Sequence, residues 1–205
     1  ASENVLANPK SLKIIDGAVK LNKAAATSSM TAPTITYVQD NGELRGVGYS
    51  YGINLLNGGT LRPGSNAATS QTKNTGIISI ERNLNAETGS HIYVNKTKTD
   101  SISVNSITGA ESQAWAFLKV GGNATINGTI HVTYGTTWKP ADGDYVRVFD
   151  CEGTISGTPT FDIQELPEGL VWDTSELLSQ GIIKVSSSTG IKGIDATSEF
   201  IADVY

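Results

Sequence analysis

Short runs rich in isoleucine and valine recur along this chain, and in many of them apolar and polar residues alternate. Ile78 and Ile80 flank Ser79, and the segment 130–134 separates Ile, Val and Tyr by His and Thr in the same way. A period of two places one set of side chains on a buried face of a strand and leaves the other set in water. The pattern therefore predicts many short strands, each with one buried face.

The runs are bounded by Gly, Asn, Asp or Ser, the residues that end strands and form turns. The chain is short of Leu, Glu and Arg, which helices favour, and rich in Ile and Thr, which strands favour, so composition also favours an all-β protein. One stretch has a helical pattern, Thr174–Gln180, with Asp173 or Thr174 as its N-cap and Gly181 as its stop. The expected strands are Leu12–Ile15, Ala18–Leu21, Thr34–Val38, Gly76–Ile80, His91–Val94, Ser101–Val104, Ala116–Val120, Ala124–Tyr134, Tyr145–Asp150, Thr160–Ile163 and Gly181–Val185.

The spacing of these runs fits either a β-sandwich or the coils of a parallel β-helix, which is a solenoid. Hairpin signals between the runs are weak, because the one well-placed Asn-Gly pair, Asn127–Gly128, is followed at once by a strand. The connections also vary in length and carry no helical pattern. We therefore expect a parallel β-helix, with parallel pairing across Gly76–Tyr134, and keep the β-sandwich as the alternative.

Several motifs point to a family. Residues 166–177 read LPEGLVWDTSEL and are followed by Gly181–Val185, while Gly59–Gly64 reads GTLRPG and Gly143–Asp150 reads GDYVRVFD. These motifs resemble the coils and the closing block of the passenger region of bacterial autotransporter-like proteins, including surface adhesins of Bacteroidetes. The resemblance implies a right-handed single-stranded parallel β-helix that is secreted or displayed at the bacterial cell surface. It carries over no shared active site.

The same resemblance implies a division of the chain. Residues 1–189 are expected to form the β-helix domain, with 166–185 as its closing block. Residues 190–205 resemble the first strands of a C-terminal sorting or anchoring module, so we expect the start of a truncated module there.

The closing block contains a dense group of apolar residues. An open end of a solenoid must be covered, because its apolar side chains would otherwise face water. We expect this cap to be formed by Leu170, Trp172, Leu177 and Leu178, with Trp172 buried.

Charge and cysteine content limit the partners of this chain. The net charge is −5, and the four arginines are scattered, so no basic stripe exists for nucleic acid. No apolar run approaches the roughly 18 residues of a membrane-spanning helix. The single cysteine, Cys151, has no partner for an internal disulfide. No helix N-terminus or histidine lies beside it in the sequence, which predicts an inert thiol near the end of a strand.

The residues that could carry chemistry are sparse. His91 and His131 are the only histidines, and both alternate with apolar neighbours, so we expect them to point outward and to diverge. We predict no catalytic residue, no metal ligand and no cofactor. Trp115 and Trp138 lie in loop-like contexts and are the best candidates for contact with a ligand.

These observations favour a non-enzymatic, adhesin-like or display module of a larger secreted bacterial protein. Its partner would be a glycan or a protein on a host or cell surface. One alternative is a carbohydrate-active β-helix, of the polysaccharide lyase or glycosidase type, whose acidic residues converge only in three dimensions. Another is an accessory β-sandwich that binds glycans.

Overall fold

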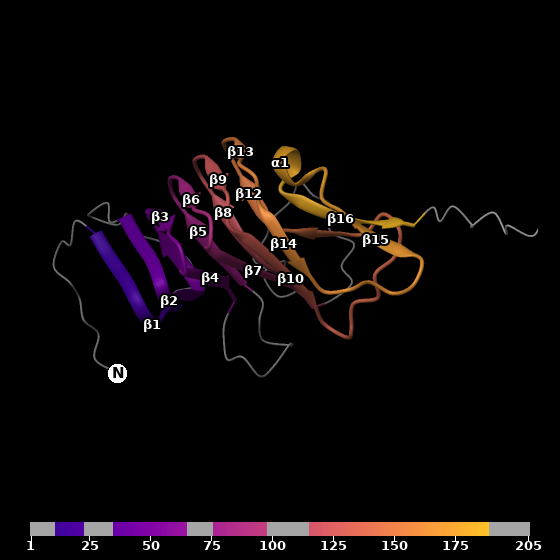
Figure 1. Cartoon of the computed structure of the whole chain (residues 1–205), viewed down its shortest axis with the longest axis horizontal. Coiled ribbons are helices and arrows are strands. Elements are labelled where there is room, and N and C mark those ends of the chain that lie inside the picture. The colour runs from indigo at the N-terminus through magenta and orange to yellow at the C-terminus, as the bar shows by residue number, and fades with distance from the viewer. Residues whose placement is uncertain (1–10, 23–34, 65–75, 98–114, 189–205) are drawn as a thin grey trace, which may run out of the picture.

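The computed structural model describes residues 11–22, 35–64, 76–97 and 115–188 (Figure 1). Within these ranges almost all regular structure is strand, and the one helix, α1 (Leu177–Gln180), has four residues. The expectation of an all-β protein is confirmed. The strands are β1 (Ser11–Asn22), β2 (Ile35–Ser50), β3 (Gly52–Leu55), β4 (Thr60–Pro63), β5 (Gly76–Ile80), β6 (Leu84–Ala86), β7 (His91–Lys96), β8 (Trp115–Val120), β9 (Ala124–Ile126), β10 (Thr129–Tyr134), β11 (Tyr145–Arg147), β12 (Phe149–Cys151), β13 (Ile155–Ser156), β14 (Thr160–Ile163), β15 (Leu170–Asp173) and β16 (Ile182–Ser187).

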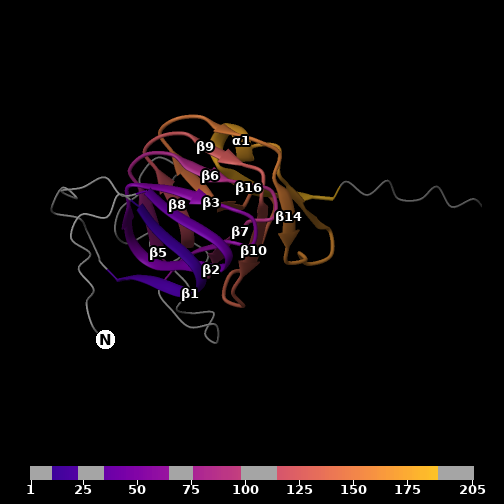
Figure 2. The same cartoon turned by 60° about the vertical axis from the view of Figure 1, so that its left-hand side comes forward.

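Most described strands pair in three parallel ladders within one sheet. Ladder A joins β2, β3, β6, β9 and β13. Ladder B joins β2, β5, β8 and β12, and ladder C joins β2, β4, β7, β10 and β14. From β2 to β14 the chain visits the ladders in the order A, C, B and then repeats that order. Figure 2 shows β3, β6 and β9 together on one side of the molecule and β7, β10 and β14 on another.

The pairing expected for Gly76–Tyr134 is confirmed in these ladders, where β5 pairs β8, β6 pairs β9 and β7 pairs β10 in parallel. Strands β7 and β8 add one short antiparallel contact, in which Asn95 opposes Ala116 and Lys96 opposes Trp115. The expected strand Ser101–Val104 lies outside the described residues. Strand β1 pairs with β2 in parallel and stands at one end of the ladders.

The parallel register places apolar residues over apolar residues from strand to strand. On ladder C, Leu61 pairs with Ile92, and Ile92 pairs with Ile130, and all three are fully buried. Burying such a side chain stabilises the fold by roughly 1.5–3 kcal/mol. The stacks on the other two ladders are Ile53, Leu84 and Ala124, and Ile78, Leu118 and Phe149.

The closing block folds differently from the ladders. Strands β11, β16 and β15 form a separate antiparallel sheet, whose buried residues Val146, Ile183 and Val185 join the main core. Of the cap residues expected here, Leu177 is buried, while Leu170 and Trp172 are half-buried against the core.

Two details differ from the expected cap. Trp172 is not fully buried, and its indole N–H donates to the carbonyl of Gln164 at 2.8 Å near the surface. Leu178 points away from the core and is 44% exposed. The cap itself stays a prediction, and residues 190–205 lie outside the described part of the chain.

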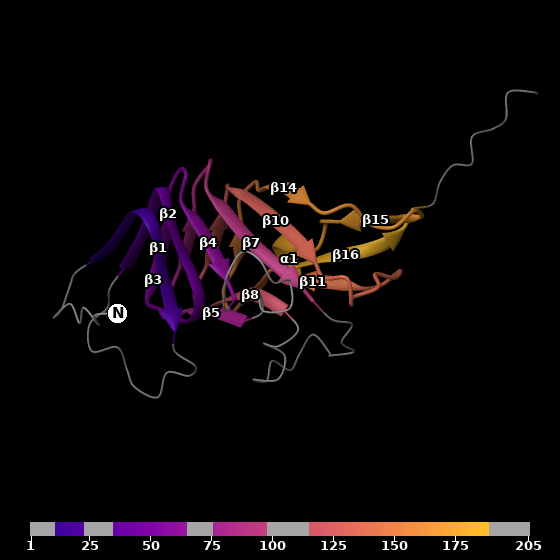
Figure 3. The ribbon, with the colours of Figure 1, turned by 90° about the horizontal axis from the view of Figure 1, so that it is seen from below.

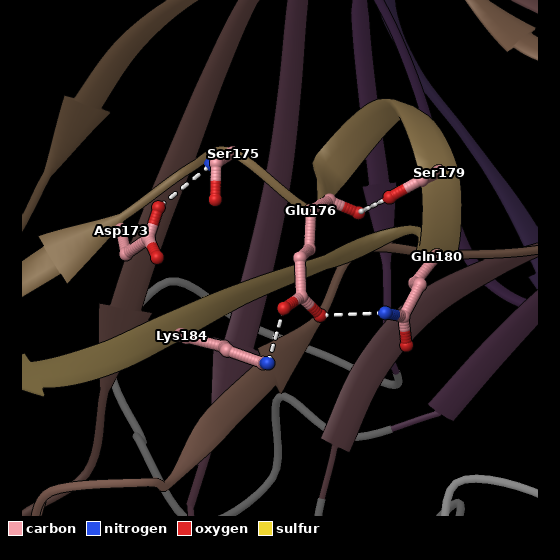
Figure 4. Close-up of polar contacts among 6 residues, drawn as sticks. All are labelled: Asp173, Ser175, Glu176, Ser179, Gln180 and Lys184. Carbon is pink, nitrogen blue, oxygen red and sulfur yellow. Dashed lines mark hydrogen bonds and ion pairs between the residues drawn. The ribbon is translucent and has the colours of Figure 1, made fainter.

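The helix is shorter than the sequence predicts. It begins at Leu177, and the residue at its N-cap position, Glu176, makes no capping hydrogen bond with its side chain. Asp173 instead accepts the backbone N–H of Ser175 at 2.9 Å, which forms a turn before the helix (Figure 4). The predicted stop is confirmed, because Gly181 adopts the left-handed conformation with φ of 71°.

Candidate functional site

The outward face of ladder C carries a row of polar and aromatic side chains. Because side chains alternate along a strand, the residues that follow the buried Leu61, Ile92 and Ile130 face outward. The register aligns Tyr93 with His131, and His131 with Asp162. We call Arg62, Tyr93, His131 and Asp162 the polar row. Figure 3 shows three of the strands that carry it, β4, β7 and β10, side by side.

Each member of the polar row contacts the next one across a strand boundary. The Arg62 guanidinium lies 3.8 Å above the centre of the Tyr93 ring. The Tyr93 ring stacks on the His131 ring, with centroids 4.1 Å apart and planes within 6°. His131 Nδ1 lies 2.7 Å from Asp162 Oδ2. At the other end, Arg62 Nε donates to Glu43 Oε1 at 2.9 Å. The row is therefore a continuous chain of contacts over neighbouring strands.

The two histidines converge, so the expectation that they diverge is wrong. His91 Nδ1 lies 3.0 Å from His131 Nε2. Both rings do point outward, as alternation predicts, but His91 lies opposite Thr129 and is therefore the diagonal neighbour of His131. The two residues are 40 positions apart in the chain, and only the register of β7 on β10 reveals the contact.

The hydrogen-bond network assigns the proton positions of this pair. Asp162 can only accept when ionised, so His131 Nδ1 carries the proton and His131 Nε2 is the acceptor toward His91. Burial lowers the pKa of His91 below its ordinary value, and the nearby His131 lowers it further by repelling a second positive charge. One proton therefore lies between the rings, on the hydrogen bond from His91 Nδ1 to His131 Nε2.

Exposure changes along the row. The side chain of His131 is 13% exposed, whereas that of Asp162 is 74% exposed. Beside the row, Asn95 Nδ2 donates to Thr133 Oγ1, and the Thr129 and Thr160 hydroxyls lie 2.9 Å apart. The face thus combines a covered aromatic centre with a polar edge that is open to water.

Trp115 and Trp138 do not stand on exposed loops. They are only 6% and 1% exposed, so neither ring forms an open surface in the described structure, and their contact with a ligand stays a prediction. Trp115 is the first residue of β8, and Trp138 packs edge-on against Tyr134. Their rings instead surround the ammonium group of Lys96, which lies 4.9 Å and 4.5 Å from the two ring centres. The ammonium group also donates to the backbone carbonyl of Tyr145 at 2.8 Å, and the attraction of a cation to aromatic faces adds to this hydrogen bond.

A small cavity lies at the other side of the molecule, between β12, β13 and α1. It has a volume of about 320 Å³ and is lined by residues that include Arg147, Asp150, Cys151, Leu178 and Gln180. The Cys151 thiol donates to the carbonyl of Gly122 at 3.1 Å. Burial raises its pKa, and the charges of Asp150 and Glu152 also raise it. The thiol therefore stays protonated near neutral pH, in agreement with the inert thiol that the sequence predicts.

The last helix and its neighbours form a polar cluster of their own (Figure 4). Glu176 accepts from Gln180 Nε2 at 2.7 Å and forms an ion pair with Lys184 on β16. These contacts tie α1 to the antiparallel sheet. Each is made within the closing block, so the cluster holds that block together.

Over the described residues, no three histidine, cysteine, aspartate or glutamate side chains are grouped so that they could hold a metal ion. In the same part of the chain, no helix has the length and apolar character needed to cross a membrane. No protein-family model and no curated protein sequence matches this chain.

Proposed function

We propose that this chain is a right-handed parallel β-helix that serves as a non-enzymatic adhesive or display module of a secreted bacterial surface protein. The repeated order of ladders A, C and B supports the β-helix, because a chain that winds in one direction returns to each ladder once per turn. The right-handed sense and the location at the cell surface rest on the resemblance to autotransporter passengers.

The observation that carries the function is the polar row. Its residues are joined to one another over neighbouring strands, so they form a continuous patch on the outward face of one ladder. A sheet face of this kind suits weak contacts that are repeated along an extended partner and gain strength by multivalency. Sugar hydroxyls are the matching chemistry, because Asp162 accepts hydrogen bonds and the Thr129 and Thr160 hydroxyls can both donate and accept.

A second candidate function is acid–base chemistry on a polysaccharide, favoured by the convergence of His91 with His131 beside Arg62. The separation of the carboxylates weakens it. The carboxylates of the row stand at opposite ends, with Glu43 on β2 and Asp162 on β14. Four spacings of about 4.8 Å between neighbouring strands place them roughly 19 Å apart. Glycosidases need their two carboxyl groups within about 10 Å.

The test is an array of bacterial and host glycans probed with the purified chain and two variants. We expect binding that is lost in Asp162→Ala and retained in Asn85→Ala, which alters an exposed polar residue on ladder A. Equal binding by both variants would contradict the role of the polar row. Turnover of any of these glycans that disappears in His131→Asn would instead establish the second candidate.

A further inference from the structure

Two contacts fix the orientation of the His131 ring, as is usual for a histidine that binds a metal ion. Its Nδ1 donates to Asp162 Oδ2 at 2.7 Å, which fixes the tautomer and leaves a lone pair on Nε2. Its ring plane is fixed by the Tyr93 ring stacked against it. The lone pair of His131 Nε2 therefore points in a set direction, toward His91.

The spacing of the two ring nitrogens suits a shared metal ion. Metal–imidazole bonds are roughly 2.0–2.1 Å long, so two nitrogens bound at square-planar to tetrahedral angles lie about 2.8–3.4 Å apart. His91 Nδ1 and His131 Nε2 are 3.0 Å apart. The ring planes are inclined by 44° with centroids 5.2 Å apart, and the two nitrogens face each other across a hydrogen bond. An ion bound to both nitrogens lies to one side of the line that joins them, so both rings turn to direct their lone pairs to it, His131 within the plane of its stack on Tyr93.

The local charges permit a cation at this point. Asp162 contributes a negative charge behind His131, and the positive charge of Arg62 is offset by Glu43 at 2.9 Å. His131 is part-exposed, so a hydrated ion can reach the pair and keep water on its remaining positions.

We propose that His91 and His131 form a two-histidine site for a divalent transition metal of the Cu²⁺, Ni²⁺ and Zn²⁺ class. The ion takes the place of the hydrogen bond between the rings. The single ring proton of His91 moves from Nδ1 to Nε2 through water, the ion exchanges two bound waters for the two imidazole nitrogens, and no proton is lost and no electron is transferred. The ion links β7 to β10, the strands that carry the two ligands.

The experiment uses Cu²⁺, which binds nitrogen ligands most tightly among these ions, and the untagged chain. The chain holds only two histidines, so every imidazole nitrogen seen by electron paramagnetic resonance comes from this pair. We expect one Cu²⁺ per chain and a spectrum in which the copper couples to two imidazole nitrogens. We also expect a melting temperature that rises with Cu²⁺ concentration. A spectrum with one or no imidazole nitrogen would overturn the proposal, and this readout needs no variant.

The variants separate the ligands from their support. Either His91→Asn or His131→Asn should abolish the two-nitrogen spectrum. Asp162→Ala should keep the spectrum and weaken the affinity about tenfold, the effect of losing a carboxylate behind a ligating histidine. Cys151→Ser is the matched control and should leave affinity unchanged. Equal affinity of the His91→Asn/His131→Asn double variant and the parent chain would refute the site.

Discussion

The side-chain oxygen of Asn123 accepts two hydrogen bonds from Thr154, one from its backbone N–H and one from its hydroxyl, each 3.0 Å long. The two residues are 31 positions apart and lie at the turns before β9 and β13 on ladder A. Asn83 Oδ1 accepts the backbone N–H of Asn123 in the same way, at 2.9 Å. Asparagine side chains thus accept hydrogen bonds from backbone N–H groups in the turns, between the strands of the ladder.

We expect Asn123→Ala to lower the free energy of unfolding by about 1–2 kcal/mol, because two hydrogen bonds are lost and the Thr154 N–H loses its acceptor. Urea denaturation measures the change. Asn85→Ala is the matched control, since Asn85 donates to the side chain of Asn54 on an exposed surface, and it should cost about 0.5 kcal/mol. An equal decrease in the free energy of unfolding in the two variants would show that the Asn123 contacts stabilise the fold no more than an exposed hydrogen bond does.

The aromatic residues near the closing block should differ in their contribution to stability. Trp138 is fully buried, so Trp138→Ala should cost about 3–5 kcal/mol. Trp172 is half-buried, and Trp172→Ala should cost about 2 kcal/mol, from partial burial and from one hydrogen bond to Gln164. Thermal denaturation ranks the two variants, and a larger loss for Trp172 would contradict the observed packing.

Two glycines with similar backbone angles offer a test of close packing. Gly181 has φ of 71°, and a Cβ there would lie 2.2 Å from the carbonyl oxygen of Phe149. Gly143 has φ of 86°, and a Cβ there would meet nothing within 4 Å. Gly143→Ala should therefore lower the free energy of unfolding by about 1 kcal/mol, from backbone strain alone. Gly181→Ala should lower it further, because the new Cβ also meets the carbonyl oxygen of Phe149. Equal melting temperatures for the two variants would exclude the contact with Phe149.

Stability should depend on pH through His91. Its pKa in the folded chain lies below the ordinary value, because burial and the neighbouring His131 disfavour the charged ring. The unfolded chain then binds more protons, so this contribution is complete above a pH of about 6.5 and is lost as the pH falls through the lowered pKa.

His91→Gln should remove this part of the pH dependence. Glu43, Arg62 and Asp162 also face the pair, so the measured quantity is the difference between the parent chain and the variant in urea denaturation from pH 7.5 to pH 5. A difference that stays constant over this range would contradict the lowered pKa.

The thiol of Cys151 should react slowly in the folded chain. Its pKa is raised, mainly by burial, and it donates a hydrogen bond to the carbonyl of Gly122. We expect iodoacetamide at pH 8 to modify the folded chain much more slowly than the chain unfolded in urea. Mass spectrometry over time measures both rates, and similar rates would disprove the protected thiol.

Alternation predicted individual strands well. Gly76–Ile80 and Thr160–Ile163 are strands with the expected bounds. It failed for β2, which continues to Ser50 through glycines at 42, 46 and 48 that read as turns. Gly42 and Gly46 let β1 come close, since a Cβ at Gly42 would lie 2.3 Å from the carbonyl oxygen of Ile14 and one at Gly46 would lie 2.2 Å from that of Leu21.

The polar row could not be predicted because its contacts depend on register. His131 lies 40 residues from His91 but 31 from Asp162, so no fixed repeat along the chain pairs these residues. The burial of the two tryptophans could not be predicted for a related reason. Neither Trp115 nor Trp138 lies inside an alternating run of apolar and polar residues. Their rings are covered because they pack around Lys96, which belongs to another strand.

The three ladders also determine how the molecule responds to a mechanical load. The strands of the ladders cross the long axis of Figure 1 obliquely, so the hydrogen bonds between them run largely along that axis. Tension applied between the two ends stretches these bonds directly and detaches the outermost strands first. Detaching the segment from Asn123 to Thr154, 31 residues that lead from one strand of ladder A to the next, releases about 100 Å of extended chain. The fold therefore unfolds in steps under tension. Work is absorbed at each step, while the strands that are still paired stay folded.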